Sequence, residues 1–238
     1  FWSISLYPFS LITHTFNFFK KFSSRNVFKI KVICVGNIFI GGTGKTALAI
    51  EIYNLLKKNH KTVFIKKNYK NQKDEINLLK NKGAIISNSS RLKSLYLAQK
   101  NNFSLAVMDD GLQQKNIKYD LKIVCFNSTE GLGNGFLLPA GPLRESINEL
   151  KYCDIAILNG EKINNRLKRR IKEINKNIKI FEGTYEPENL KNLNINRNYL
   201  MFCGLGNPEE FKKKLIKYKF KIKKEFIFPD HYQFSTNE

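Results

Sequence analysis

At residues 36–46 the chain reads Gly36-Asn37-Ile38-Phe39-Ile40-Gly41-Gly42-Thr43-Gly44-Lys45-Thr46, directly after the apolar run Val32–Val35 and before an amphipathic segment. A strand that ends in glycines and opens a helix with Gly-Lys-Thr has the composition of a phosphate-binding loop. Glycines allow backbone N–H groups to turn towards an anion, and the new helix adds the positive end of its dipole. In such a loop the lysine, here Lys45, reaches the outer phosphates, and the hydroxyl of Thr46 binds Mg²⁺. We therefore predict that a nucleotide binds at Gly41–Thr46.

The match to the usual phosphate-loop pattern is incomplete. The pattern GxxxxGK[ST] requires a glycine at position 39, where this chain has Phe39, and the variant KGGxGK[ST] requires a lysine where it has Ile40. The alternative is a glycine-rich turn that binds nothing. That interpretation leaves four glycines and a Gly-Lys-Thr between a strand and a helix unexplained, so the phosphate loop is favoured.

The composition is typical of a globular protein, with 42% hydrophobic and 26% charged residues in a chain of 238. Lys and Arg number 41 against 20 Asp and Glu, so the formal net charge is +21. Such an excess suits binding to nucleic acid or to an anionic membrane surface, but the lysines are scattered without an arginine-rich or aromatic-interleaved cluster. We attribute most of the charge to compositional bias and predict no nucleic-acid partner. The four cysteines have no CxxC spacing and are expected to be buried free thiols.

Strands alternate with helices along the chain. Strands are predicted at 30–35, 62–65, 84–86, 105–108, 121–126, 155–158 and 178–181. This alternation predicts an α/β fold, a P-loop NTPase-like core with a mostly parallel sheet flanked by helices. Further strands at 199–203 and 225–228, with a helix that starts at Asn207-Pro208, predict a small C-terminal α/β subdomain. The expected domains are 1–22, 23–186 and 187–238, and we expect the chain to be a fragment whose last domain is incomplete.

Carboxylates follow two of these strands. Asp109 and Asp110 end the strand at 105–108, where a phosphate-loop enzyme needs a carboxylate to hold Mg²⁺ or its waters. The two are predicted to divide between metal binding and a structural role. Asp74 and Glu75 lie just past the strand at 62–65, at the ligand-binding edge of an open sheet, but they also suit the first turn of a helix. On the residues alone, helix capping is favoured.

Three further candidates lie in loops. The segment 131–145 is too rich in glycine and proline for regular structure until Leu143, and a long loop inside a compact domain is usually functional. At its end, Arg144 is a candidate phosphate ligand and Glu145 a candidate partner for a metal or a basic group, against the alternative of an exposed ion pair. His231, beside a carboxylate at a strand end, either orients a base or is a turn residue, and the residues alone favour the turn.

Aromatic residues dominate the first 22 positions. Apolar residues recur at helical spacing between Phe9 and Phe19, and two lysines close the segment. A helix of about 14 residues, rising about 1.5 Å per residue, is too short for a hydrocarbon core of about 30 Å. The basic pair follows the apolar part, which argues against a signal peptide. A helix packed on the protein and an interfacial helix remain, and the aromatic face favours the membrane surface.

Together these motifs resemble those of the tetraacyldisaccharide 4'-kinases, the lipid A 4'-kinases of Gram-negative bacteria. They occur in the family's order and are Val35–Asn37 with Gly41–Thr46, Asp109–Gln113, Gly133–Gly135 with Leu137–Glu145, Gly204–Pro208 and Phe228–His231. They cover nearly the whole chain from Trp2 onward. A loop without the first Walker glycine is a trait of the family, so Phe39 is compatible with it.

The resemblance implies transfer of the ATP γ-phosphate to the 4'-hydroxyl of a tetraacyl glucosamine disaccharide 1-phosphate, with Mg²⁺, at the cytoplasmic face of the inner membrane. It implies that Asp74 is the base that takes the hydroxyl proton and that His231 is its partner, in place of the capping and turn interpretations. Lys45 and Arg144 would neutralise charge on the phosphoryl oxygens. The candidate metal ligands are Thr46, Asp109, Asp110 and Glu145. The expected partners are the lipid A disaccharide precursor and, through the N-terminal helix, the membrane surface.

The competing interpretation is a membrane-surface P-loop ATPase that acts on a protein partner, in which Asp74 is only a helix cap. The chain also departs from the family's motifs around the proposed acceptor site. Gln114 replaces a histidine, Lys67-Asn68-Tyr69 replaces Arg-Gly-Tyr, and Ile76 replaces a proline. These changes concern the acceptor more than the fold.

Overall fold

The computed structural model describes residues 2–20, 22–69, 73–187, 189–205, 207–229 and 232. It forms two compact units, residues 1–184 and residues 185–238, each described by itself. The sequence placed this boundary between residues 186 and 187, and it treated residues 1–22 as a separate segment, which here is grouped with the first unit.

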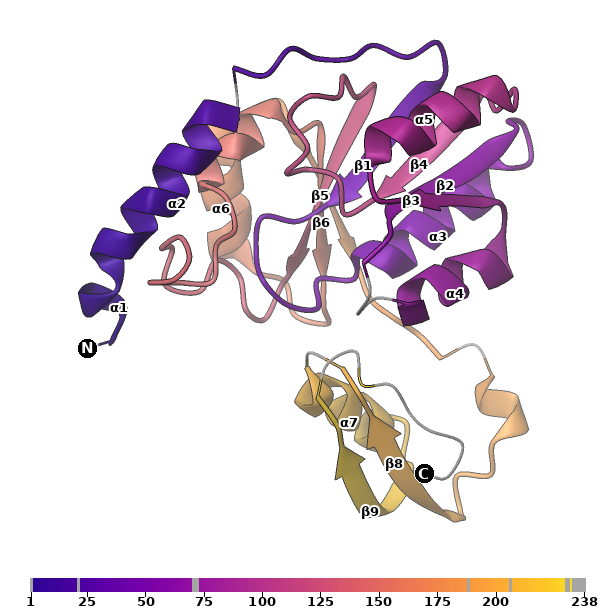
Figure 1. Ribbon diagram of the computed structural model, residues 1–238. Helices are drawn as coiled ribbons and strands as arrows, with labels where there is room; N and C mark the ends of the chain where they lie inside the picture. The colour runs from indigo at the N-terminus through magenta and orange to yellow at the C-terminus, as the bar shows by residue number, and fades with distance from the viewer. Residues whose placement is uncertain are drawn as a thin grey trace. The chain divides into compact units, whose positions relative to one another are not determined.

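The first unit is built on a seven-stranded sheet in the order β3-β2-β4-β1-β5-β6-β7, in which every neighbouring pair is parallel (Figure 1). The strands are β1 Lys31–Gly36, β2 Thr62–Lys67, β3 Ile85–Asn88, β4 Leu105–Asp109, β5 Leu121–Asn127, β6 Ile155–Asn159 and β7 Lys179–Gly183. Their central members are near-continuous apolar runs, as expected for strands covered on both faces. The predicted mostly parallel α/β core is confirmed.

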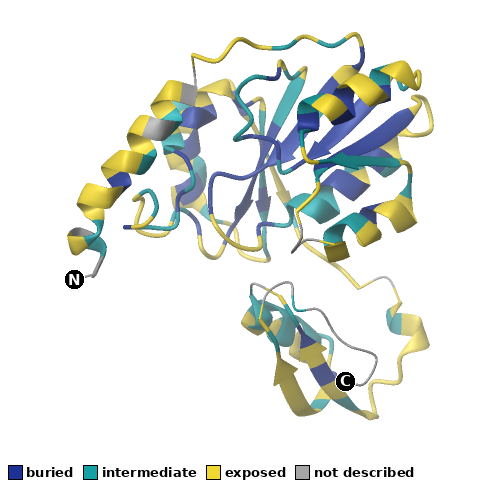
Figure 2. Ribbon diagram, viewed as in Figure 1, coloured by how far each residue is buried: buried dark blue, intermediate teal, exposed yellow. Residues whose placement is uncertain are grey.

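Helices cover both faces of the sheet (Figure 2). Because side chains alternate along a strand, Val35 of β1 packs with α3 (Lys45–Leu56) and α4 (Lys73–Lys82), whereas Val32 and Cys34 face the opposite side. On that side lie α5 (Arg91–Lys100), α6 (Asn165–Ile174) and the 3-10 turn Ile147–Tyr152. All four cysteines are buried free thiols, as predicted.

The topology brings several loops together at the carboxyl edge of the sheet. The chain leaves β1, forms β2 and β3 on one side, returns to β4 beside β1, and then continues to β5 on the other side of β1. In the register, Val35 pairs with Asp109, and Gly36 pairs with Val124. Ligands of open parallel sheets bind where the strand order reverses in this way. The end of β1 is therefore the expected binding position.

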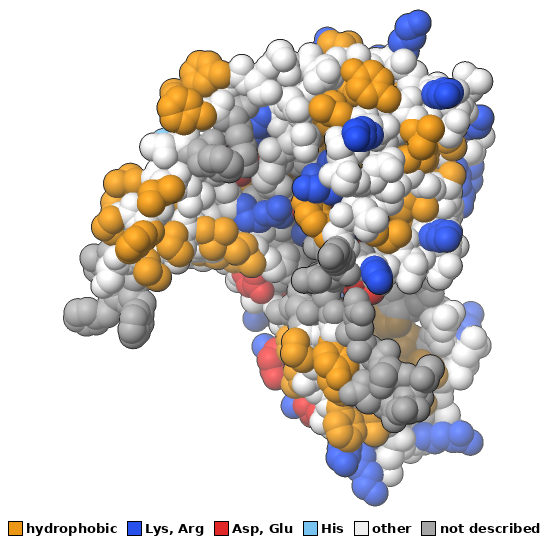
Figure 3. Space-filling model, viewed as in Figure 1, with side chains coloured by type: hydrophobic (Ala, Val, Ile, Leu, Met, Phe, Trp, Pro, Cys, Tyr) orange, Lys and Arg blue, Asp and Glu red, His pale blue; other side chains and the backbone are white. Residues whose placement is uncertain are grey.

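The N-terminal segment forms α1 (Trp2–Ser5) and α2 (Tyr7–Lys20), and α2 packs on the loop 131–145 through polar groups. Ser10 Oγ donates to the carbonyl of Leu137 at 2.9 Å, and Asn17 Nδ2 donates to the carbonyl of Arg144 at 3.0 Å. The opposite side of α2 leaves large apolar side chains exposed, among them Ile12 at 67% and Phe19 at 71% (Figure 3). Among the described residues, no helix combines the length and the apolar character needed to cross a membrane.

The second unit contains a β-α-β arrangement. Strands β8 (Asn198–Cys203) and β9 (Lys221–Ile227) are parallel, and α7 (Pro208–Lys217) connects them. The helix starts as predicted, because the Asn207 side chain accepts a hydrogen bond from the Glu210 N–H at 3.1 Å and Pro208 occupies the first turn. This is the small α/β subdomain expected from the sequence. A 3-10 turn at Leu190–Asn192 precedes it.

Candidate active site

The loop after β1 has the backbone geometry of a phosphate cradle. Gly41 and Gly44 have φ of 114° and 80°, a region that L side chains rarely adopt, and α3 begins at Lys45 directly after Gly44. A side chain at Gly42 would meet no atom within 4 Å, so the loop leaves open space there. The start of a helix presents free N–H groups and a positive dipole end to that space. The predicted loop is therefore folded for anion binding.

Three hydrogen bonds fix this loop from outside. Asn37 Nδ2 donates to Thr43 Oγ1 at 3.0 Å, and Asn159 Nδ2, at the end of β6, donates to the Thr43 carbonyl at 2.6 Å. The Ile40 N–H donates to the carbonyl of Pro142 at 2.9 Å. Thr43 itself is buried. The cradle is thus held by groups outside its glycines.

Phe39 occupies the position of the missing glycine without backbone strain. Among the described residues, those with a positive φ do not include Phe39. Its side chain is buried, with 7% of the residue exposed, and its backbone forms an antiparallel β-bridge with Leu143. An L residue therefore fits this position. Phe39 anchors the phosphate loop on the loop 131–145, which explains why the glycine pattern is not needed here.

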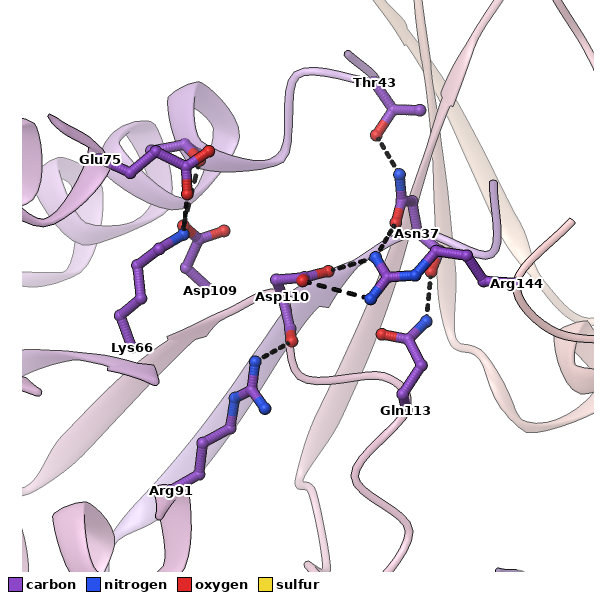
Figure 4. A network of polar contacts seen from close by, with 10 residues as sticks. Asn37, Thr43, Lys66, Glu75, Arg91, Asp109, Asp110, Gln113 and Arg144 are labelled. Atoms are coloured by element: carbon purple, nitrogen blue, oxygen red, sulfur yellow. Dashed lines mark hydrogen bonds and ion pairs between the residues drawn. The ribbon is translucent and has the colours of Figure 1, made fainter. Parts of the chain in front are cut away.

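Asp109 lies at the end of β4 and faces the first turn of α3. Its Oδ2 accepts a hydrogen bond from Thr46 Oγ1 at 3.1 Å. The same oxygen accepts one from Lys66 Nζ at 2.6 Å (Figure 4). Lys66 also forms an ion pair with Glu75 of α4. Burial alone would lower the pKa of Lys66, but the carboxylates of Asp109 and Glu75 outweigh it and raise that pKa above its usual value. The Lys66 side chain is therefore a charged ammonium.

Asp110 points into a different set of contacts. Its carboxylate pairs with Arg144, Nη1 to Oδ1 at 3.0 Å and Nη2 to Oδ2 at 3.4 Å, and Arg144 Nη1 also donates to Asn37 Oδ1 at 3.1 Å. Arg91 Nη2 donates to the Asp110 carbonyl at 2.6 Å, and Gln113 Nε2 donates to the Asn37 carbonyl at 2.7 Å. Burial would raise the pKa of Asp110, yet Arg144 and Lys45 lower it below its usual value. Asp110 therefore remains ionised and orients Arg144.

Glu145 is held by a different partner. It is buried and accepts a hydrogen bond from Lys115 Nζ at 2.7 Å, and the same ammonium contacts Glu149 at 2.8 Å. These three residues line a cavity of about 170 Å³ together with Arg25 and eight others, none of them from Gly41–Thr46. Glu145 is thus engaged by a basic neighbour, which was the second of the two roles considered for it.

Of the two residues assigned to proton transfer, Asp74 and His231, the structure describes only Asp74. Asp74 is an exposed residue of the first turn of α4, next to Glu75, which reaches Lys66. His231 lies outside the described residues. Among the described candidates, the structure joins Thr46 to Asp109 and Asp110 to Arg144 by direct contacts.

Sequence reasoning missed Lys66, Arg91 and Asn159 as site residues. The predicted strand at 62–65 stopped before Lys66, but β2 extends to Lys67, so Lys66 lies within it, 2% exposed. The rule that drew attention to Asp109, a charged residue directly after a buried apolar run, also applied to Lys66. Asn159, which directly follows the apolar residues of β6, was detectable by the same rule extended to uncharged polar residues.

A phosphate-binding loop after the first strand of a parallel sheet, with a threonine and an aspartate beside it, defines a P-loop nucleotide-binding protein. The profile of one family, described as tetraacyldisaccharide-1-P 4'-kinase, matches residues 2–90 and 70–238. The chain belongs to this family.

Relatives of the chain carry the same name. The tetraacyldisaccharide 4'-kinase of Pelagibacter ubique is 47% identical over 240 residues, which cover 100% of this chain and 76% of that protein. The tetraacyldisaccharide 4'-kinase of Rickettsia canadensis is 35% identical over 222 residues, 86% of this chain and 67% of that protein. A crystal structure of LpxK from Aquifex aeolicus in complex with ATP has a TM-score of 0.76 at 24% identity and covers 99% of this chain and 84% of its own. It supports the fold.

Proposed function

We propose that this chain is an ATP-dependent kinase that transfers the γ-phosphate of ATP to the 4'-hydroxyl of a tetraacyldisaccharide 1-phosphate, a step of lipid A biosynthesis. The observation that carries the proposal is the contact of Thr46, at the start of α3, with Asp109 at the end of β4, in a chain of the 4'-kinase family. This pair lies beside the cradle formed by Gly41–Lys45. Phosphoryl transfer requires a cradle and a metal carboxylate in this arrangement.

The donor set at this pair fits Mg²⁺. Asp109 Oδ1 is buried and has no hydrogen-bond partner among the described residues, and the hydroxyl of Thr46 contacts the other oxygen of this carboxylate, Oδ2. Oxygen ligands of this kind are what Mg²⁺ prefers, and it usually takes the rest from phosphate and water. When bound, the ion neutralises charge on the phosphates. We assign it to Thr46 and Asp109 in preference to Asp110 and Glu145. Lys66 contacts Oδ2 of Asp109 and leaves Oδ1 available, whereas Arg144 contacts both carboxylate oxygens of Asp110, and Glu145 lies with Lys115 in a cavity that contains no residue of Gly41–Thr46.

Lys45 and Arg144 supply fixed positive charge. Lys45 is the first residue of α3, where the lysine of a phosphate loop reaches the outer phosphates. Arg144 is oriented by Asp110 and Asn37, so its position does not depend on the nucleotide. Charge that is already in place costs no reorganisation when the phosphoryl group moves, which is the main source of catalysis in this chemistry.

Asp74 is proposed as the base that accepts the proton of the sugar hydroxyl, with His231 as its partner. The support from the structure is the place of Asp74 in the first turn of α4, one residue before Glu75, which the Lys66 ion pair connects to Asp109. A base must reach the hydroxyl that attacks the phosphorus. The role of His231 rests on the family resemblance.

We also propose that α2 lies on the cytoplasmic surface of the inner membrane. Its polar contacts with the loop 131–145 leave apolar residues such as Phe9, Ile12 and Phe19 on the outside. An amphipathic helix with aromatic residues on one side binds in the interface between lipid headgroups and chains. Because Asn17 contacts the residue Arg144, this surface is connected to the site where an acylated acceptor would react.

The direct test is phosphate transfer from γ-labelled ATP to a purified tetraacyldisaccharide 1-phosphate in detergent micelles. The chain is expected to label the lipid, and Lys45→Ala is expected to lower the rate by at least about a hundredfold because the phosphates lose their cation. ATP hydrolysis at the same rate with and without the lipid would contradict the proposal and favour an ATPase that acts on a protein partner.

A further inference from the structure

Lys66 is a buried cation between carboxylates from two other elements. It lies on β2, and its ammonium contacts Asp109 at the end of β4 and Glu75 in the first turn of α4 (Figure 4). The side chains of Lys66, Glu75 and Asp109 are 3%, 24% and 0% exposed. Three elements of the first unit are thus joined at one nitrogen atom, beside the proposed metal site.

A lysine suits this position because its ammonium carries three N–H donors around one compact charge. Without it, two carboxylates would share a poorly solvated space and repel each other. Removing one member of a buried charge network leaves the remaining charges uncompensated, which is costly. Loss of Lys66 would therefore drive Glu75 away from Asp109.

The movement of Glu75 has a direct effect on Asp74. The two residues are adjacent in the first turn of α4, and Leu79, in the next turn, is the buried residue of this helix. The ion pair with Lys66 is therefore an anchor for the end of α4 that carries the proposed base. The rest of the helix is held by Leu79 in the core.

We propose that Lys66 is a positioning residue that fixes the first turn of α4, and with it Asp74, against the nucleotide side of the site through Glu75. This inference rests on the proposed function. Lys66 acts on the reaction through Asp74 and makes no contact with ATP in this role. It therefore affects the turnover number more than the binding of nucleotide.

The experiment compares Lys66→Met, Glu75→Ala and the double variant, with Lys31→Met as the matched control. Lys31 also forms an ion pair, with Asp120, but its side chain is 72% exposed. It is the first residue of β1 and therefore lies at the amino ends of the strands, opposite the edge that carries the site. For Lys66→Met we expect kcat to fall at least about tenfold with the KM for ATP within about threefold, because a small displacement of a reacting group has a large effect on rate. The double variant should be no slower than Lys66→Met, since both changes break the same link.

Hydrogen exchange supplies a readout that does not depend on activity. The amides of residues 76–79, the first of α4 that have acceptors within the helix, should exchange faster in Lys66→Met and in Glu75→Ala. Exchange in α3 should not change in these variants, and exchange in α4 should not change in Lys31→Met. If the wild-type chain transferred no phosphate, the proposed function would fail, and exchange in α4 would still test the link.

Three results would overturn the inference. The first is a lower melting temperature for Lys66→Met with unchanged kcat and unchanged exchange in residues 76–79, which would mark a purely structural ion pair. The second is a raised KM for ATP with unchanged kcat, which would make Lys66 a nucleotide ligand. The third applies even if Lys66→Met does not fold: Glu75→Ala with normal kcat and normal exchange would show that α4 needs no such anchor.

Discussion

Arg144 and Asp110 form a two-point ion pair, with Nη1 3.0 Å from Oδ1 and Nη2 3.4 Å from Oδ2. The pair joins the end of the loop 131–145 to the residue after β4. Asn37 links Arg144 to the phosphate loop, because it accepts a hydrogen bond from Arg144 and donates one to Thr43. The backbone carbonyl of Arg144 also accepts a hydrogen bond from the side chain of Asn17 in α2. One arginine thus connects the nucleotide loop to the helix proposed to meet the membrane.

Asp110→Asn should lower kcat/KM by about ten- to a hundredfold, because Arg144 loses the charge that orients it and small displacements of such groups are costly. Steady-state phosphate transfer to the lipid acceptor measures this. Glu173→Gln is the matched control, since it removes an exposed ion pair with Arg170 and should change the rate less than about twofold. A normal rate for Asp110→Asn would show that Arg144 needs no partner.

The stability of the first unit should depend on Asp110 at acid pH. Burial raises the pKa of this carboxyl, but Arg144 and Lys45 together lower it below the ordinary value of 3.8. A group with a lowered pKa stabilises the folded state fully above its unfolded pKa, and this contribution is lost as the pH falls through the folded pKa. Urea unfolding between pH 5 and 2.5 should therefore show a shallower loss of stability in Asp110→Asn than in the wild type. Parallel curves would contradict the assignment.

Lys115 should be important for stability, since it compensates two buried glutamates, Glu145 and Glu149. Lys115→Met is expected to reduce the free energy of unfolding by about 3 kcal/mol, because breaking a buried ion pair leaves an unpaired charge. The exposed neighbour Lys118, changed to Met, is the control. Burial lowers the pKa of Lys115, but the two glutamates raise it above 10.5, so its contribution is complete below pH 10.5 and is lost as the pH rises through the folded pKa. Chemical unfolding of both variants at neutral and alkaline pH tests this.

Thr46→Ala should weaken the response to Mg²⁺. The variant lacks the hydroxyl that contacts Asp109, so the Mg²⁺ concentration that gives half of the maximal rate should rise about tenfold, an effect typical of a lost metal contact. Binding of ATP without Mg²⁺, measured by calorimetry, should change less than about threefold, because the backbone cradle is intact. The exposed Thr129, changed to Ala, is the control. An unchanged Mg²⁺ response would remove Thr46 from the proposed metal site.

The sequence was sufficient for the parallel sheet and the phosphate loop, because both depend on local patterns. Apolar runs of strand length alternate with helices, and Gly44-Lys45-Thr46 follows the first run directly. The sequence predicted that Asp109 and Asp110 have different roles, but not which residue has which role. They are adjacent residues of one type, and only the left-handed backbone at Asp110, φ 58°, turns its carboxylate to Arg144.

Long-range contacts explain what sequence reasoning missed. Lys66 directly follows an apolar run, but its partners Glu75 and Asp109 are 9 and 43 positions further along the chain, so the local pattern does not show which residues it contacts. Glu145 had two open roles for the same reason. Its partner Lys115 lies 30 residues earlier, in the connection between β4 and β5. Both residues acquire their roles only when parallel strands bring the segments together.

The exposed side of α2 should determine membrane binding. Ile12 is 67% exposed and Phe19 is 71% exposed, while Ser10 and Asn17 hold the helix to the loop 131–145. Burying each apolar side chain in lipid contributes about 2 kcal/mol, so Ile12→Ser and Phe19→Ser should each weaken binding to phosphatidylglycerol vesicles by about tenfold or more. Thr15→Ala, on the same helix and also exposed, should bind as the wild type does. Vesicle co-sedimentation measures the membrane affinity of the three variants. Phosphate transfer to an acceptor dissolved in detergent is the control that each variant retains an active site. Equal affinities in all three would mean that α2 serves only as a packed helix.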